Sequence, residues 1–597
     1  MDPEVKTYLI LLLVSLVLMI GGGAFASYVN SDFGFVHVYQ ISIYGDHGAV
    51  ISAMLYVPST ASPKHPPAPP AVLAVNGWNN QKEFMQNVAI ELARRGYVVL
   101  IMDPYGHGLS GGTIGLLIAY GPYGTVSALK YLASLPMVNA SDIGLVGHSM
   151  GGLAITEAAL ALPSDYRSMF LMESTPFWYG FYSLSLVSHL KNVAIAFGLY
   201  EELGPLMMHE PTGFDAPKSP LLMQFFNTSQ PVVPNMIYGS ISDGTARILY
   251  QPPITHAQAT DDPTEIAEVI QWFYQTLGAP PIYIPPSNQI WQWKVVGTGI
   301  ALFGAFIFLF AAGSLLLRAG VFRSLVRPVP DYRGGFTGGI GWWINAVIVT
   351  ALGPALYIWT NLFVWSHLTS FVSIVFPQVQ SDVYMFWALV VGGITIVLLI
   401  LDHFVFLRKK GATAVNYGLS WGGDRKTTII NIIKAFVFAA IVLSALYVIL
   451  AFVFYTFNVD FRLWIWALEP MTFRRFVYFW AYLLPFSVLL VPLAVLFSGF
   501  MRPRNGGEVG IGAEMAINSV VLTLGIIIWL VIVYGEIFAG HAPNLSVLPI
   551  YMIPFVILWP LVASLATFYF RKTGNAYVGA FLVTMFIVWY VVAFDSF

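Results

Sequence analysis

The sequence of 597 residues contains no cysteine and few charged residues. The absence of cysteine excludes disulfide bonds, thiol nucleophiles and metal sites built on Cys pairs. Charged residues make up 10 % of the chain, against about 25 % in an ordinary soluble domain, while hydrophobic residues make up 57 %. With a mean hydropathy of +0.72, this composition is typical of a protein that lies largely within a membrane.

Acidic residues outnumber basic ones in one part of the chain only. Residues 30–288 contain nine Lys and Arg against eighteen Asp and Glu, a net charge of −9, whereas the whole chain carries −2. The remaining residues therefore carry +7. Because the acidic part offers no basic face to offset phosphate charge, we expect no nucleic acid among the partners.

The first 27 residues are expected to form a signal peptide or a signal anchor. Residues 8–20 are apolar and follow Lys6, and Ala24-Phe25-Ala26 resembles a signal-peptidase site. Whether or not it is cleaved, such a segment exports the residues that follow it.

A series of long apolar runs begins near residue 290. Each run has about the 20 residues that an α-helix needs to cross the hydrocarbon core of a bilayer. We therefore expect residues 283–597 to form a membrane domain of eight transmembrane helices, or nine spans in all if the N-terminal segment is retained. The predicted helices cover residues 291–317, 341–366, 383–405, 430–456, 476–499, 516–539, 548–569 and 575–595.

Basic residues gather in alternate loops between these predicted helices. The loops on the other side contain only Arg462, Arg474 and Arg475. The positive-inside rule places the more basic loops in the cytoplasm, so residues 28–282 are expected on the extracytoplasmic side of a cell membrane. The basic residues that follow the first, third, fifth and seventh predicted helices are Arg318, Arg323, Arg327, Arg333, Arg408, Lys409, Lys410, Arg425, Lys426, Arg502, Arg504, Arg571 and Lys572.

Residues 28–282 alternate between strand-like and helix-like patterns. This alternation predicts a mostly parallel sheet with helices on both faces. Strands are expected at 36–43, 50–57, 71–75, 97–102, 143–146, 168–172, 192–197 and 246–250, and helices at 81–95, 123–135, 153–162 and 263–277.

Residues 147–151, Gly-His-Ser-Met-Gly, join one expected strand to the helix that follows it. A GxSxG sequence at such a junction is typical of a nucleophile elbow, a sharp turn that exposes the serine hydroxyl above the sheet. The small residues at 147 and 151 let strand and helix approach closely. Ser149 is therefore the candidate nucleophile, with a chance turn in a glycine-rich chain as the alternative.

Several further motifs, in order along residues 36–278, resemble those of the α/β-hydrolase family. Residues 74–78 stand where that family has a strand ending in His-Gly, and residues 103–111 resemble its D-x-x-G-H-G-x-S segment. Residues 192–201 resemble the strand and turn that carry the catalytic acid. His256 stands before the last helix, where the catalytic base belongs. The resemblance implies an α/β-hydrolase domain with nucleophile, acid and histidine in that order.

The chemistry of such a site explains the residue types. A serine hydroxyl becomes nucleophilic when an imidazole removes its proton and a carboxylate orients that imidazole. His256 is the candidate base and Glu201 the candidate acid. Glu202 and Asp243 remain alternative acids, although Asp243-Gly244 is also a common turn dipeptide.

The backbone N–H groups of Met150 and Trp78 are expected to form the oxyanion hole. No metal and no other cofactor is expected. The expected activity is hydrolysis of a carboxylic ester through an acyl-enzyme, with lipid-like or other apolar acyl esters favoured by the membrane location. A serine peptidase or amidase would use the same triad. A non-catalytic ectodomain on a transporter or membrane scaffold is the alternative from another class of protein.

Aromatic residues are concentrated at 177–182. This segment is expected either to cap Ser149 and bind apolar substrate groups, or to contact the membrane surface.

Overall fold

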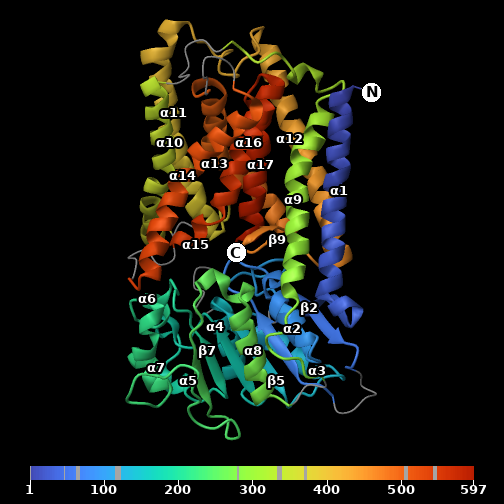
Figure 1. The fold of residues 1–597 in the computed structure, drawn as a ribbon, viewed down its shortest axis with the longest axis vertical. Helices are drawn as coiled ribbons and strands as arrows, with labels where there is room; N and C mark the ends of the chain where they lie inside the picture. Colours follow the sequence, from blue (N-terminus) through green and yellow to red (C-terminus); the bar gives the residue numbers. More distant parts are fainter. Residues whose placement is uncertain are drawn as a thin grey trace.

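The computed structural model describes residues 2–45, 48–61, 68–114, 123–278, 282–331, 339–368, 373–502, 509–541 and 548–597. Figure 1 shows a sheet domain at one end of the molecule and a helical region at the other. The chain enters at the far end of the helical region, and its last residues lie between the two parts.

The sheet domain is built on eight strands in the order β1-β2-β4-β3-β5-β6-β7-β8. The first three in this order pair antiparallel, and every other neighbouring pair is parallel. The predicted mostly parallel sheet is therefore confirmed. The strands are β1 (Val36–Tyr44), β2 (Val50–Pro58), β3 (Ala71–Val75), β4 (Val98–Met102), β5 (Ile143–His148), β6 (Ser168–Met172), β7 (Val193–Ala196) and β8 (Arg247–Tyr250).

Each face of this sheet is covered by helices and has its own apolar core. Neighbouring strand residues point to opposite faces, so Leu73 lies in the core beneath α3 and α4, and Val72 in the core beneath α2 and α8. The helix expected at 81–95 starts as a 3-10 turn, η3 (Lys82–Met85), before α2. The covering helices are α2 (Gln86–Ala93), α3 (Thr125–Ser134), α4 (Met150–Ala161) and α8 (Pro263–Thr276).

Short helical turns fill the connections near the carboxyl ends of the later strands. They are η4 (Trp178–Gly180), α5 (Leu184–Val187), α6 (Gly204–Met207), η5 (Gly213–Lys218), α7 (Pro220–Phe225) and η6 (His256–Asp261).

The described part of the chain contains nine helices that are long and apolar enough to cross a membrane. One is α1 near the N-terminus, and the other eight follow residue 290, as predicted. The span expected at 548–569 is divided into α15 and α16 just before Pro554, because proline cannot donate the hydrogen bond that would continue a helix. The helices are α1 (Pro3–Asn30), α9 (Trp291–Leu316), α10 (Gly339–Phe363), α11 (Val379–Asp402), α12 (Arg425–Phe457), α13 (Phe473–Val495), α14 (Ile511–Phe538), α15 (Leu548–Met552), α16 (Phe555–Thr573) and α17 (Tyr577–Phe594).

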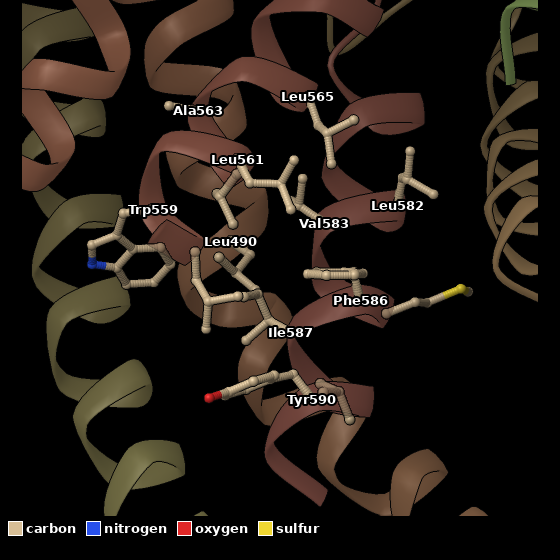
Figure 2. Close-up of a cluster of buried hydrophobic side chains, with 14 of the residues drawn as sticks. Leu490, Trp559, Leu561, Ala563, Leu565, Leu582, Val583, Phe586, Ile587 and Tyr590 are labelled. Carbon is tan, nitrogen blue, oxygen red and sulfur yellow. The ribbon is translucent and has the colours of Figure 1, made fainter. Parts of the chain in front are cut away.

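Helix α17 lies at the centre of the helical region. Within its most apolar window, 83 % of the residues are buried inside the protein, more than in the other candidate spans. Figure 2 shows why: Phe586 and Ile587 of α17 lie among side chains of α13 and α16 such as Leu490 and Leu561. A helix that is apolar all round belongs in such an interior position.

The basic loops gather at the end of the helical region far from the sheet domain, where the chain also begins (Figure 1). Arg318 forms an ion pair with Asp2 at 2.9 Å. Arg327 donates to the carbonyl oxygens of Gly574 and Ser420 at 2.8 and 2.6 Å. These contacts bring the loops after α9, α11 and α16 together. The uneven distribution of basic residues seen in the sequence therefore corresponds to two distinct ends of the molecule.

The connection between α12 and α13 joins the helical region to the sheet domain. It forms a hairpin of β9 (Phe461–Leu463) and β10 (Trp466–Leu468), which the sequence analysis did not predict. Arg462 of this hairpin is buried and pairs with Asp460 at 2.8 Å. Arg475 donates to the carbonyl oxygen of Gly106 in the sheet domain at 3.1 Å. Arg475 thus links the two parts directly, while the Arg462 guanidinium lies 5.9 Å from the centre of the Phe84 ring of the sheet domain, and neither arginine faces water.

Close packing of α1 on α9 makes a first prediction possible. A Cβ on Gly22 would lie 2.6 Å from the carbonyl oxygen of Gly297, whereas a Cβ on Gly21 would meet nothing within 4 Å. We expect Gly22→Leu to destabilise the protein by about 1–3 kcal/mol through overpacking. Gly21→Leu is the matched control and should leave stability unchanged. Thermal unfolding in detergent, followed by tryptophan fluorescence, measures both; equal melting temperatures would contradict a retained, packed α1.

Candidate active site

The turn between β5 and α4 has the conformation of a nucleophile elbow. Ser149 adopts φ 55° and ψ −125°, a backbone conformation that non-glycine residues rarely occupy. A Cβ on Gly147 would lie 2.3 Å from the carbonyl oxygen of Gly151, and one on Gly151 would lie 2.2 Å from that of Val75. Only glycine fits at these two positions, and the tight turn places the serine at the carboxyl edge of the sheet.

Two other predicted residues meet Ser149 at this edge. Glu201 follows β7 and His256 follows β8, so both come from loops beyond the carboxyl ends of strands. The Nε2 atom of His256 lies 2.8 Å from Ser149 Oγ, and its Nδ1 atom lies 2.8 Å from Glu201 Oε1. With its proton on Nδ1, the imidazole donates to Glu201 and accepts from Ser149, which is the tautomer that a general base requires.

The structure also separates the alternative acids from the imidazole ring. Glu202 Oε2 accepts a hydrogen bond from the main-chain N–H of His256 at 2.7 Å and does not contact Nδ1. Asp243 lies exposed in a turn, where Ser242 donates to it at 3.3 Å. Of the three carboxylates considered, Glu201 is the one at the ring.

Charge and burial act together on His256 and Glu201. Burial would lower the pKa of His256, but the negative charges of Glu201 and Glu202 outweigh burial and raise it above the ordinary value of 6.5. Burial would raise the pKa of Glu201, but His256 and hydrogen bonds from Glu173 and the Leu203 N–H hold it below its ordinary value. The carboxylate is thus charged at neutral pH and favours the protonated imidazole that forms when Ser149 loses its proton.

Burial shifts the pKa of three neighbouring titratable groups in the direction that favours their neutral forms. Burial, followed by hydrogen bonding and repulsion from Glu201, raises the pKa of Glu173 well above its usual range. Burial and the charge of Glu201 raise the pKa of Glu202 to about 7. Burial and the neighbouring His256 lower the pKa of His148 to about 3. The sequence analysis did not single out Glu173, and only its place directly after β6 could have suggested it. His148, next to the nucleophile, is expected from the sequence to point away from the site, but its ring lies 5.0 Å from that of His256.

The loop after β3 lies directly against the elbow. A Cβ on Gly77 would be 2.9 Å from the Cβ of Ser149. Asn76 donates through Nδ2 to the carbonyl oxygen of Asn80 at 2.6 Å, which closes the turn that carries Trp78. Trp78 and Met150, at the start of α4, therefore flank Ser149.

The aromatic segment that follows β6 is part of the sheet domain. Phe177 and Trp178 are buried, and the ring of Phe177 contacts that of Phe225 in α7 at 5.9 Å. Contact with the membrane surface is therefore wrong for these two residues, because their rings lie in the core beneath α5 and α7.

The helical region contributes residues around the site that sequence analysis missed. The Trp78 ring contacts Trp365 at 5.6 Å and Tyr551 at 6.5 Å, and its Nε1 donates to Ser596 Oγ at 2.8 Å. No local pattern could have predicted these contacts, because they join residues nearly 300 or more positions apart. Within the described ranges, no group of three or more His, Asp and Glu residues is arranged to hold a metal ion.

The fold and this edge of the sheet define the class of the N-terminal part of the chain: it is an α/β-hydrolase domain, followed by a region of long apolar helices. Residues 66–199 match the sequence model of the family described as serine aminopeptidase, S33. The match includes Ser149 and ends before Glu201 and His256. No curated protein matches the sequence.

Several solved structures are similar to the sheet domain. The esterase Pf2001 of Pyrococcus furiosus is 16 % identical, with a TM-score of 0.31, over 42 % of this chain and 96 % of that one. Est1E of Butyrivibrio proteoclasticus, solved with ferulic acid bound, is 16 % identical, with a TM-score of 0.30, over 40 % and 98 %. A dienelactone hydrolase from Anabaena variabilis is 18 % identical, with a TM-score of 0.29, over 41 % and 100 %.

Proposed function

We propose that the protein is a membrane-anchored serine hydrolase that cleaves carboxylic esters, with lipid-like or other apolar acyl esters as substrates. The observation that carries this proposal is the pair of 2.8 Å contacts that link Ser149 Oγ through the His256 ring to Glu201. Nucleophile, base and orienting carboxylate stand in the order in which acyl transfer uses them.

In this mechanism Ser149 Oγ attacks the ester carbonyl carbon while its proton passes to His256 Nε2. The carbonyl oxygen becomes an oxyanion, which the main-chain N–H groups of Met150 and Trp78 stabilise. The bond from the acyl carbon to the alcohol oxygen then breaks, and His256 gives its proton to the departing alkoxide. Water next attacks the acyl carbon and gives a proton to His256 Nε2. The bond between the acyl carbon and Ser149 Oγ then breaks, His256 returns its proton to Ser149 Oγ, and the acid leaves.

The location supports the substrate class. Basic loops gather at the end of the helical region opposite the sheet domain, and the positive-inside rule assigns that end to the cytoplasm. The hydrolase domain then lies at the extracytoplasmic surface. Its site faces the ends of the apolar helices, where amphiphilic esters are concentrated.

A serine peptidase or amidase is the second candidate function. One observation favours it, the match of residues 66–199 to a family described as a serine aminopeptidase. The same residues would act, with an amine leaving in place of an alcohol.

Labelling with a fluorophosphonate probe tests the proposal on the full-length protein in detergent. We expect phosphonylation of Ser149, located by mass spectrometry, and no labelling of Ser149→Ala. Turnover of short-chain esters, long-chain esters and aminoacyl amides should then favour the esters. An unlabelled Ser149 would instead support a non-catalytic ectodomain, and preferential cleavage of amides would support the peptidase.

The charges around His256 also predict the pH dependence of activity. Protonation of His256 removes the general base, so kcat/KM should fall about tenfold per pH unit on the acid side. Because Glu201 and Glu202 raise the pKa of His256, the acid limb should lie above pH 6.5. A pH–rate profile of kcat/KM with a soluble ester measures this. A flat profile would contradict the assignment of His256 as base, and a limb below pH 6.5 would contradict the upward shift of its pKa.

A further inference from the structure

A transmembrane helix is hydrogen-bonded to the loop that carries the candidate base. The hydroxyl of Tyr534, in α14, donates to Glu202 Oε1 at 2.8 Å. The other oxygen of the same carboxylate, Oε2, accepts from the main-chain N–H of His256 at 2.7 Å. One carboxylate therefore connects α14 to the residue whose ring contacts Ser149.

We propose that Tyr534 is a positioning residue for catalysis: through Glu202 it fixes the main chain of His256, so that the helical region forms a working part of the active site. This proposal rests on the proposed serine hydrolase function. Tyr534 touches neither the imidazole ring nor Ser149, so its effect would pass through Glu202 alone.

Burial makes this connection sensitive to the loss of either bond. Glu202 is 1 % exposed, and each of its oxygens accepts one hydrogen bond. The Tyr534 hydroxyl and the His256 main-chain N–H both donate to the buried Glu202 carboxylate. Losing either donor leaves a buried oxygen without a hydrogen bond, which costs free energy. Burial and the charge of Glu201 raise the pKa of Glu202 to about 7, whereas the hydrogen bonds from His256 and Tyr534 lower it and so favour the charged carboxylate.

Other contacts fix the same loops from the same side. Trp464, in the β9–β10 hairpin, donates through Nε1 to the carbonyl oxygen of Ala257 at 2.6 Å, one residue after His256. The ring of Tyr200, next to Glu201, contacts Phe538 of α14 at 4.8 Å. The helical region thus contacts both the loop that carries Glu201 and the loop that carries His256. The bond from Tyr534 ends on the carboxylate that accepts the main-chain hydrogen bond of His256.

The first test is Tyr534→Phe in the full-length protein, which removes only the hydroxyl. With a soluble short-chain ester as substrate, we expect kcat to fall about 10- to 100-fold while KM stays within about twofold. Losing the hydrogen-bond partner that orients a metal-binding residue in an enzyme has an effect of this size. The matched control is Tyr447→Phe in α12, whose hydroxyl donates to the carbonyl oxygen of Met471 at 3.2 Å. It should leave kcat unchanged. An unchanged kcat in Tyr534→Phe, or a rise in KM alone, would overturn the proposal.

A double-mutant cycle with Glu202→Gln separates positioning from a general loss of structure. If Tyr534 acts through Glu202, adding Tyr534→Phe to Glu202→Gln should lower kcat no further. Independent effects that multiply would overturn the proposal. Should Tyr534→Phe fail to fold, Glu202→Gln alone must lower kcat at constant KM, and an unchanged kcat would refute the connection. Ser149→Ala is measured alongside: if it keeps full activity, the proposed function itself fails.

Discussion

Ser149→Ala is expected to lower kcat for ester hydrolysis by about 10⁶-fold, and His256→Ala by a similar factor. The reason is the 2.8 Å contact between Ser149 Oγ and His256 Nε2: without the hydroxyl there is no acyl-enzyme, and without the imidazole the hydroxyl keeps its proton. The double variant should be no slower than either single variant, because the two residues act as one unit. Initial rates with a chromogenic ester, measured on full-length protein in detergent, give all three values.

Matched control variants show whether a loss of activity comes from the substitution itself or from preparation of the protein. Ser134 and His189 are exposed residues of the sheet domain, so Ser134→Ala and His189→Ala should keep wild-type kcat. Melting temperatures of all variants should agree within a few degrees. A Ser149→Ala protein that retains a tenth of the wild-type rate would mean that ester hydrolysis does not use this serine.

Local signals predicted the elbow well and the interface poorly. The strand at 143–146 and the glycines at 147 and 151 lie within a few residues of one another, so sterics within that stretch dictate the turn. The order of Ser149, Glu201 and His256 came from the resemblance to a family, and the structure brings their side chains together. The hairpin of β9 and β10 escaped prediction because its strands have three residues each, too few to display a period.

The contacts between the two parts of the molecule could not be read from the sequence. Arg462 and Arg475 looked like ordinary outer-loop charges, yet both are buried: Arg462 pairs with Asp460 and Glu469 of its own connection, and Arg475 donates to the sheet domain. Hydropathy identifies the helices because each must match a bilayer, but it carries no information on which helix end meets which loop. The same holds for Tyr534, whose partner Glu202 lies 332 positions away.

Glu201→Gln should lower kcat by about 10³- to 10⁴-fold, while Asp243→Asn should change it by less than about twofold. Glu201 lies 2.8 Å from His256 Nδ1, and its negative charge stabilises the imidazolium that forms during attack. An amide at this position has no such charge, and its NH₂ group can donate to Nδ1, which would place the imidazole proton on Nε2 and block its role as base. Asp243 sits in an exposed turn and serves as the control.

The size of the Glu201→Gln effect also shows whether a neighbouring carboxyl group can replace Glu201 as the partner of His256. Burial raises the pKa of Glu173 well above its usual range, whereas the pKa of Glu201 is lowered. Glu173 is therefore a poorer source of negative charge than Glu201. If Glu201→Gln retains wild-type kcat while Asp243→Asn is inactive, the acid has been assigned to the wrong loop. If both retain it, the imidazole works without an orienting carboxylate at Nδ1, and the contact at 2.8 Å is structural only.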